Sequence, residues 1–263
     1  MFNSMYRRVA TALVATAVAA ATAVGIPAAA YAASVPTLLG SNQASSAGSV
    51  TLPLSSAANG NVVLVWESKE GQSATPVQPT LSFNSGSCTT GSDTRHVFDD
   101  SGATRAQLGV FVLSSCSSAN GFVLTFSGQT QTHIGVIALQ VGTNDTVSTP
   151  QYGGSANNVT DGIAATLPDY TSSDVAVTVG AHEANETTVT SAFYDVVQGG
   201  VHTSQEVDSH GLDSVYGPGN GSIAVGYQTF ADAPVNASVQ DAFSSGAHWT
   251  TAAPGGVAAF VVS

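Results

Sequence analysis

The chain has 263 residues, of which 43% are hydrophobic and only 8% are charged, and its formal net charge is −12 at pH 7. This much apolar sequence argues against disorder, and with so few charges the polar surface must consist largely of Ser, Thr, Asn, Gln and Gly. The negative charge repels phosphate backbones and anionic lipid, so nucleic acids and membrane surfaces are excluded as expected partners.

The first 32 residues have the pattern of a secretory signal peptide. An Arg pair at 7–8 precedes an apolar run at 9–24, and Ala-Tyr-Ala at 30–32 matches a cleavage site. We expect cleavage after Ala32, export of residues 33–263 to the extracellular space or cell surface, and no membrane insertion afterwards. An uncleaved anchor is the alternative, because the run is nearly long enough to span a bilayer. The exported chain would carry three basic against seventeen acidic side chains, a formal charge of −14.

Beyond the signal peptide the sequence predicts strands and almost no helix. No long window repeats apolar residues at helical spacing, whereas short runs rich in Val, Ile, Phe and Thr alternate with Gly, Ser and Asn clusters. The number of predicted strands is larger than a single open sheet usually contains. We therefore expect two packed sheets. In chain order the runs are NVVLVWES (61–68), AQLGVFVLSS (106–115), GFVLTFSG (121–128), HIGVIALQV (133–141), DVAVTVGAHE (174–183), TTVTSAFYDVV (187–197), GSIAVGYQTF (221–230), APVNASVQDAF (233–243) and GVAAFVVS (256–263).

The two cysteines, Cys88 and Cys116, are expected to form one disulfide, because thiols usually oxidise in an exported chain. Two free buried thiols are the alternative. There is no Cys-x-x-Cys motif, so nothing indicates a redox role.

A loose internal repeat predicts that the chain is built twice from one β-rich unit. The stretch VTLPLSSAANGNVVLVWE at 50–67 and the stretch ATLPDYTSSDVAVTVGAHE at 165–183 share Thr-Leu-Pro, a small polar turn and an alternating apolar run that ends before Glu. We therefore expect two related halves, at about 48–142 and 158–263, joined by a Gly/Asn/Ser/Thr-rich linker. The predicted fold is a single all-β domain, a two-sheet antiparallel β-sandwich of jelly-roll type. Two tandem small sandwiches are the alternative.

This pattern resembles a group of secreted bacterial β-sandwich proteins. The likeness lies in the paired Leu-Pro openings, each followed by an apolar strand, and in the terminal run from Trp249 to GGVAAFVV. These proteins resemble concanavalin-like and jelly-roll modules, and many are uncharacterised. The resemblance implies an extracellular recognition or surface role.

Catalytic motifs are absent, and no catalytic residue is predicted. The sequence has no G-x-S-x-G, P-loop, H-E-x-x-H or EF-hand pattern, and HEANE at 182–186 has Glu where a second zinc His would be required. We expect that segment to be a solvated turn, and Asp99 to begin another turn. Glu67 and Glu70 are spaced by three, which places them on opposite faces of a strand. A glycan-active hydrolase or lyase would need carboxylates that meet from distant strands.

The best metal candidate is the Gly-rich segment EVDSHGLDSVYGPGNGS. It offers Asp208, His210 and Asp213, and oxygen-rich loops suit Ca²⁺, whereas a His with two carboxylates could also take Zn²⁺ or Mn²⁺. The alternative is an acidic surface loop whose side chains cap turns.

Aromatic rings on loops are the candidates for ligand contact. Trp249 lies in the polar stretch SGAHWTTAAPGG, and Tyr216 lies in the same segment as the metal candidates. Trp249 is the better candidate for an exposed ring, and burial within the sandwich is the alternative for both Trp249 and Trp66.

The leading function is a secreted, non-catalytic recognition or adhesion protein, with an extracellular glycan or cell-surface component as its expected partner. A glycan-active enzyme on a lectin-like sandwich is the first alternative, and a structural cell-surface or matrix protein is the second.

Overall fold

A computed structural model describes most of the chain from Ala32 onward, and its described residues hold strands but no helix. None of these residues therefore belongs to a helix long and apolar enough to cross a membrane. The residues described are 32–70, 75–99, 105–159, 164–166, 171, 173–183, 194–198, 201–207, 210–217, 221–229, 240–242 and 253–263.

The strands follow the β-branched and aromatic runs of the sequence. Those of the first half are β1 (Thr37–Ala47), β2 (Ser49–Leu52), β3 (Ala58–Glu70), β4 (Thr80–Phe83), β5 (Ser87–Asp99), β6 (Arg105–Ala119), β7 (Phe122–Thr125) and β8 (Gln131–Val141). Those of the second half are β9 (Gln151–Val159), β10 (Ala164–Thr166), β11 (Val175–His182), β12 (Tyr194–Gln198), β13 (Val201–Val207), β14 (His210–Gly217), β15 (Gly221–Thr229), β16 (Gln240–Ala242) and β17 (Ala253–Val262).

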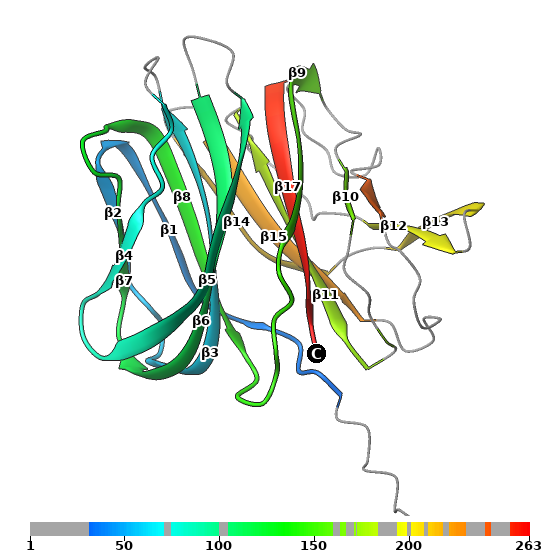
Figure 1. Cartoon of the computed structure of the whole chain (residues 1–263), viewed down its shortest axis with the longest axis horizontal. Coiled ribbons are helices and arrows are strands. Elements are labelled where there is room, and N and C mark those ends of the chain that lie inside the picture. Colours follow the sequence, from blue (N-terminus) through cyan, green and yellow to red (C-terminus); the bar gives the residue numbers. More distant parts are fainter. Residues whose placement is uncertain are drawn as a thin grey trace, which may run out of the picture. The chain divides into compact units, whose positions relative to one another are not determined.

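Within the described residues these strands form four sheets, and every pairing between neighbouring strands is antiparallel (Figure 1). Sheet A has the order β1-β8-β3-β6-β5 and sheet B the order β2-β7-β4. Sheet C has the order β14-β15-β11-β17-β9 and sheet D the order β10-β16-β12-β13. The all-β, antiparallel prediction is thereby confirmed.

Sheet A is buried on both faces, and its central strand β3 shows why. Successive side chains of a strand point to opposite faces. Val62, Leu64 and Trp66 pack against sheet B, whereas Val63 and Val65 pack against sheet C. All five are fully buried. A strand buried on both sides reads as a continuous apolar run, as the sequence VVLVW does.

Two hydrophobic clusters occupy these faces. The A/B cluster is rich in aromatic rings, and its largest members are Trp66, Phe111, Phe122 and Phe126. The A/C cluster is built mainly from Val, Ala, Ile and Leu of β3, β6, β8, β11, β15 and β17. Because this second cluster draws on both halves of the sequence, sheets A and C share one core and pack in a β-sandwich-like arrangement.

Sheets A and C order their strands alike when each half is counted from its own first strand and the paired strands β12 and β13 are counted as one. Strands β1, β8, β3, β6 and β5 correspond in this count to β9, β17, β11, β15 and β14. Corresponding edges lie at opposite sides, since β1 contacts β14 and β5 contacts β9. The Thr-Leu-Pro stretches also match, because β2 ends at Leu52 and β10 ends at Thr166, each shortly before the central strand of the larger sheet.

Candidate functional site

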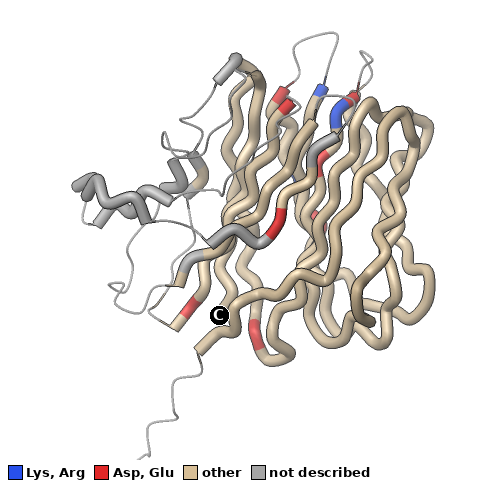
Figure 2. Tube along the Cα trace, turned by 180° about the vertical axis from the view of Figure 1, so that it is seen from behind, with Lys and Arg blue, Asp and Glu red and all other residues tan. Residues whose placement is uncertain are grey.

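Several of the few charged side chains gather where β3 ends. Glu67 and Lys69 lie on the face of β3 that points to sheet C, and Glu70 lies on the face toward sheet B. Figure 2 shows blue and red segments close together at one end of the tube. Charged groups are rarely buried unless they are paired, and perturbed ionisable groups concentrate at functional sites. This end of the sheets is therefore the candidate functional site.

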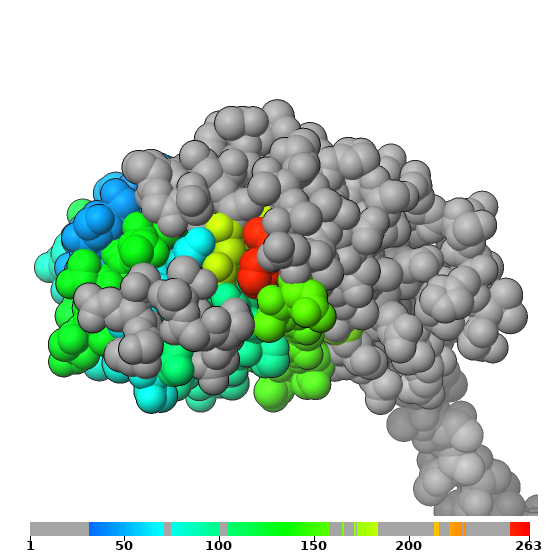
Figure 3. All heavy atoms as spheres, turned by 90° about the horizontal axis from the view of Figure 1, so that it is seen from above, coloured from blue at the N-terminus to red at the C-terminus, as the bar shows by residue number. Residues whose placement is uncertain are grey.

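Lys69 links the two halves of the chain. Its Nζ lies 3.3 Å from Oε2 of Glu183 and donates a 3.1 Å hydrogen bond to the Glu183 carbonyl. Glu183 directly follows β11, and its own N–H donates to the carbonyl of Pro254 in β17 at 3.0 Å. Figure 3 views the molecule from above, with cyan, yellow and red segments of the two halves side by side. The lysine and glutamate side chains are only 13% and 5% exposed, so the ion pair is almost wholly enclosed.

Asp99 brings a second carboxyl group to Glu183. Asp99 is the last residue of β5 and is buried, and the turn predicted to begin there continues into residues 100–104, outside the described residues. Burial, together with the hydrogen bond and the charge of Asp99, raises the pKa of Glu183 to about 7, while the Lys69 ammonium opposes that rise. Two carboxylates in contact repel each other, so near neutral pH this pair retains a proton.

Glu67 and His133 form a second buried pair. Glu67 Oε1 contacts His133 Nδ1, and His133 Nε2 lies 3.2 Å from Oε1 of Gln43 on β1. Burial disfavours the imidazolium, but the charge of Glu67 and its hydrogen bond outweigh this, so the pKa of His133 is raised. Sheet C closes over the pair at Gly221, where a Cβ would lie 2.7 Å from Glu67 Oε1. Only a glycine leaves room for the pair at that position.

A hydrogen-bond network centred on Gln107 occupies the face toward sheet B. Gln107 donates from Nε2 to Ser68 Oγ at 3.0 Å and to the Val77 carbonyl at 2.9 Å. Arg95 Nη1 donates to Gln107 Oε1 at 2.6 Å and to the Pro76 carbonyl at 3.0 Å. These bonds fix the end of β3 to β5, β6 and the segment before β4.

The two carboxyl groups that meet near the end of β3 are held by contacts within the protein. Glycoside hydrolysis needs two carboxyl groups about 5 Å apart or farther, with space for a nucleophile, an acid or a water. Asp99 and Glu183 instead hydrogen-bond to each other, and Glu183 also binds Lys69. Within the described part of the chain, no group of three or more His, Cys, Asp or Glu side chains could hold a metal ion.

The residues predicted for ligand and metal binding fall mostly outside the described side chains. Trp249 and Asp208 lie outside the described residues. His210 and Tyr216 lie in β14, but their side chains are not described. Asp213 also lies in β14, where its Oδ1 accepts a 2.8 Å hydrogen bond from the N–H of Ser214. The segment at 210–217 is therefore a strand, and the prediction that these residues share one loop is wrong for His210 and Asp213.

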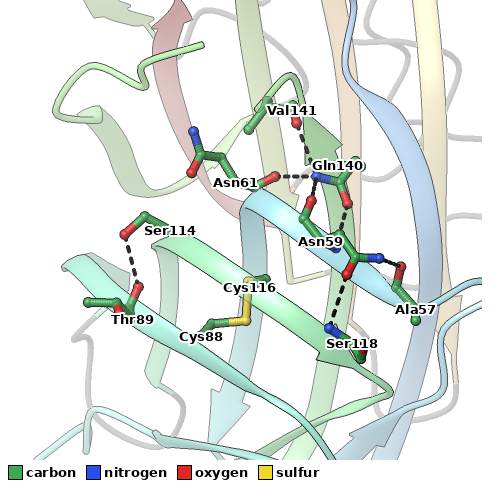
Figure 4. The surroundings of a disulfide bond; sticks show 10 residues. All are labelled: Ala57, Asn59, Asn61, Cys88, Thr89, Ser114, Cys116, Ser118, Gln140 and Val141. Atoms are coloured by element: carbon green, nitrogen blue, oxygen red, sulfur yellow. Dashed lines mark hydrogen bonds between the residues drawn. A yellow bond between two sulfur atoms is a disulfide. The ribbon is translucent and has the colours of Figure 1, made fainter. Parts of the chain in front are cut away.

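The predicted disulfide between Cys88 and Cys116 is confirmed (Figure 4). It joins β5 to β6, and Cys116 belongs to the A/B cluster. Around it, Asn59 Oδ1 accepts a hydrogen bond from the N–H of Ser118 at 3.1 Å, and Gln140 Nε2 donates to the Asn59 carbonyl at 2.6 Å. The cross-link and these bonds hold the ends of β3, β6 and β8 together.

Sequence patterns gave little warning of the charged cluster. His182 and Glu183 were expected in a solvated turn, yet both are buried because Lys69 and β17 cover them. His133, which no motif singles out, pairs with Glu67. The one available signal was the charged Glu-Ser-Lys-Glu run that continues a fully apolar strand, because a strand buried on both faces needs partners for such residues.

The chain matches no model of a known protein family, none of the curated proteins and no solved structure.

Proposed function

We propose that the chain is a secreted, non-catalytic recognition or adhesion protein, with carbohydrate as its ligand class. The signal-peptide pattern at 1–32 supports export, and the disulfide is compatible with an extracellular location. Its partner would be an extracellular glycan or another cell-surface component.

One observation carries the non-catalytic part of the proposal. Carboxyl groups from distant strands do meet, as an enzyme would require, but Asp99 and Glu183 bond to each other and Glu183 binds Lys69. A general acid or nucleophile must instead reach the substrate. The pair therefore acts as a structural connection between sheets A and C.

The exposed surface suits a neutral ligand rich in hydroxyl groups. Ser87, Thr89, Thr90 and Asp93 of β5 are exposed, and Asp93 is the only charged residue among them. Hydroxyl and amide groups can exchange hydrogen bonds with sugar hydroxyls without the desolvation that ionised groups require. These exposed hydroxyl groups, with one carboxylate among them, therefore favour carbohydrate over anionic ligands.

We also propose that the chain is one domain made of two related jelly-roll halves. The order β1-β8-β3-β6 beside β2-β7-β4 supports a jelly-roll assignment, and the order β9-β17-β11-β15 beside β10-β16-β12 supports the same assignment for the second half. This shared order supports a duplicated unit, and the core shared by sheets A and C supports one domain over two tandem sandwiches. Differential scanning calorimetry tests this, because one domain should unfold in a single transition and tandem sandwiches in two.

A glycan-array screen of residues 33–263, run with Ca²⁺ and again with a chelator, tests the recognition role. We expect saturable binding that is lost in Trp249→Ala. The matched control is Trp66→Phe, which replaces the buried tryptophan of the A/B cluster and should leave binding unchanged. Loss of binding with chelator would make Asp208, His210 and Asp213 a metal site. No binding under either condition would contradict the recognition role and favour a structural surface protein.

A further inference from the structure

The residues that follow the predicted cleavage point are docked on the body of the protein. The N–H of Ala33 donates a 2.8 Å hydrogen bond to the carbonyl of Ser173, and the N–H of Ser34 donates to Oδ2 of Asp145 at 3.1 Å. Ala33 also packs against the A/C cluster, and Pro36 is buried. The new end of an exported chain would therefore have a fixed position.

Asp145 is a buried carboxylate that lacks a full set of partners. Asp145 is only 1% exposed. Its Oδ2 accepts hydrogen bonds from the N–H groups of Ser34 and Gly142. Its other oxygen, Oδ1, is buried and receives no hydrogen bond. An unsatisfied buried carboxylate oxygen is strongly unfavourable, and a nearby cation is the usual compensation.

We propose that Asp145 binds the α-ammonium group that removal of the signal peptide creates at Ala33. The inference rests on the proposed secretion, because only processing produces this group. In that step a water molecule adds across the Ala32–Ala33 amide. Its hydroxyl becomes part of the Ala32 carboxylate, and the released Ala33 nitrogen is protonated to an ammonium.

Cleavage changes what the Ala33 nitrogen can do. As an amide it has one N–H, which the Ser173 carbonyl already accepts. As an ammonium it has three N–H donors and a positive charge, so two donors become available beside the neighbouring Ser34–Asp145 contact. Processing thus creates the positive charge that the Asp145 carboxylate lacks as a partner. Only the cleaved chain can therefore form this ion pair.

The site is also shaped for a carboxylate held in this position. A Cβ on Gly142 would lie 2.9 Å from Asp145 Oδ1, so a side chain there would displace the carboxylate. Asn61 Nδ2 donates to the Asp145 carbonyl at 2.8 Å, which fixes the backbone of the same residue to β3. The Asp145 carboxylate is therefore held in position before cleavage creates the ammonium group.

Amine acylation of the secreted protein tests the inference. Intact mass first establishes whether Ala33 is the terminal residue. The rate at which an N-hydroxysuccinimide ester modifies the α-amine is then followed from pH 6 to pH 10 by peptide mass spectrometry. Lys69 is the only other amine of the exported chain, so the two products are easily separated. The comparison proteins are Asp145→Asn and a chain with one additional glycine before Ala33.

We expect Asp145 to keep the amine protonated, so that at pH 7 it reacts about tenfold more slowly than in Asp145→Asn or in the glycine-extended chain. The whole rate profile should move to higher pH, which simple burial of the amine would not produce. The glycine-extended chain provides the comparison if Asp145→Asn does not fold. Identical profiles would overturn the inference, and so would a terminus other than Ala33. Neither result bears on glycan binding, which the array measures separately.

Discussion

Sheet A buries both of its faces, and different interactions hold the two faces. The face toward sheet B packs aromatic rings and carries the Cys88–Cys116 disulfide, which joins β5 to β6 within sheet A. The face toward sheet C packs mainly aliphatic side chains and ends in the Lys69–Glu183 and Glu67–His133 pairs. One strand, β3, contributes to both, because its side chains alternate. The face within one half therefore includes a covalent bond between two of its strands, whereas the face between the halves includes buried groups whose protonation changes with pH.

The comparison predicts that each face has its own weakness. Reduction of the Cys88–Cys116 disulfide should destabilise the A/B face and leave the charged pairs of the A/C face intact. High pH should destabilise the A/C face, because Glu183 and His133 lose their protons, and should leave the aromatic packing of the A/B face intact.

The largest effect is expected from removing the disulfide. Replacing Cys88 and Cys116 by Ala frees a loop with a sequence separation of 28, and the chain-entropy model gives a loss on the order of 3 to 4 kcal/mol in the free energy of unfolding. Urea unfolding of the oxidised protein and the double variant at one pH measures it. Equal urea midpoints would show that packing alone holds this face. The loss should be the same at pH 5 and pH 8, because no titrating group is removed.

A somewhat smaller effect is expected from Lys69→Met. This change removes the ammonium and leaves Glu183 and Asp99 enclosed without their cation, and breaking such a buried pair destabilises by about 3 kcal/mol. The loss should be greatest at pH 8, where Glu183 is ionised, and smaller at pH 5, where it is protonated. Urea midpoints at the two pH values measure the difference.

Glu183→Gln is the matched partner for Lys69→Met. If the two side chains interact as the structure indicates, the double variant should lose less stability than the sum of the two single variants at pH 8. Strict additivity would mean that Lys69 stabilises the protein through other contacts.

The strands and the disulfide could be predicted from the sequence, but the charged site could not. Local alternation identifies β3 and β11, and the signal-peptide pattern, which predicts export, makes the pairing of the two cysteines the simple choice. The contact of Asp99 with Glu183 depends on how sheet A packs on sheet C, which no local pattern encodes. His210 and Asp213 were misplaced for a related reason, because a polar, Gly-rich strand such as β14 reads like a loop.

The smallest of these effects is the pH dependence of the unmodified protein, and its sign follows from the raised pKa values. Burial and Asp99 raise the pKa of Glu183 to about 7, and the pKa of His133 is raised as well. Both groups hold a proton more tightly in the folded state than in the unfolded state. Their stabilisation is present below the unfolded pKa values and is lost as the pH rises through the folded ones. For Glu183 alone this amounts to about 2 kcal/mol between pH 5 and pH 8.

The free energy of unfolding should therefore be larger at pH 5 than at pH 8, which urea titrations at constant ionic strength would measure. Glu183→Gln should remove most of the slope, because a glutamine at this position does not titrate. If the slope persists in that variant, Glu67–His133 must carry it. A protein that is more stable at pH 8 than at pH 5 would mean that the inter-sheet carboxyl groups are ionised throughout, and that Lys69 alone compensates their charge.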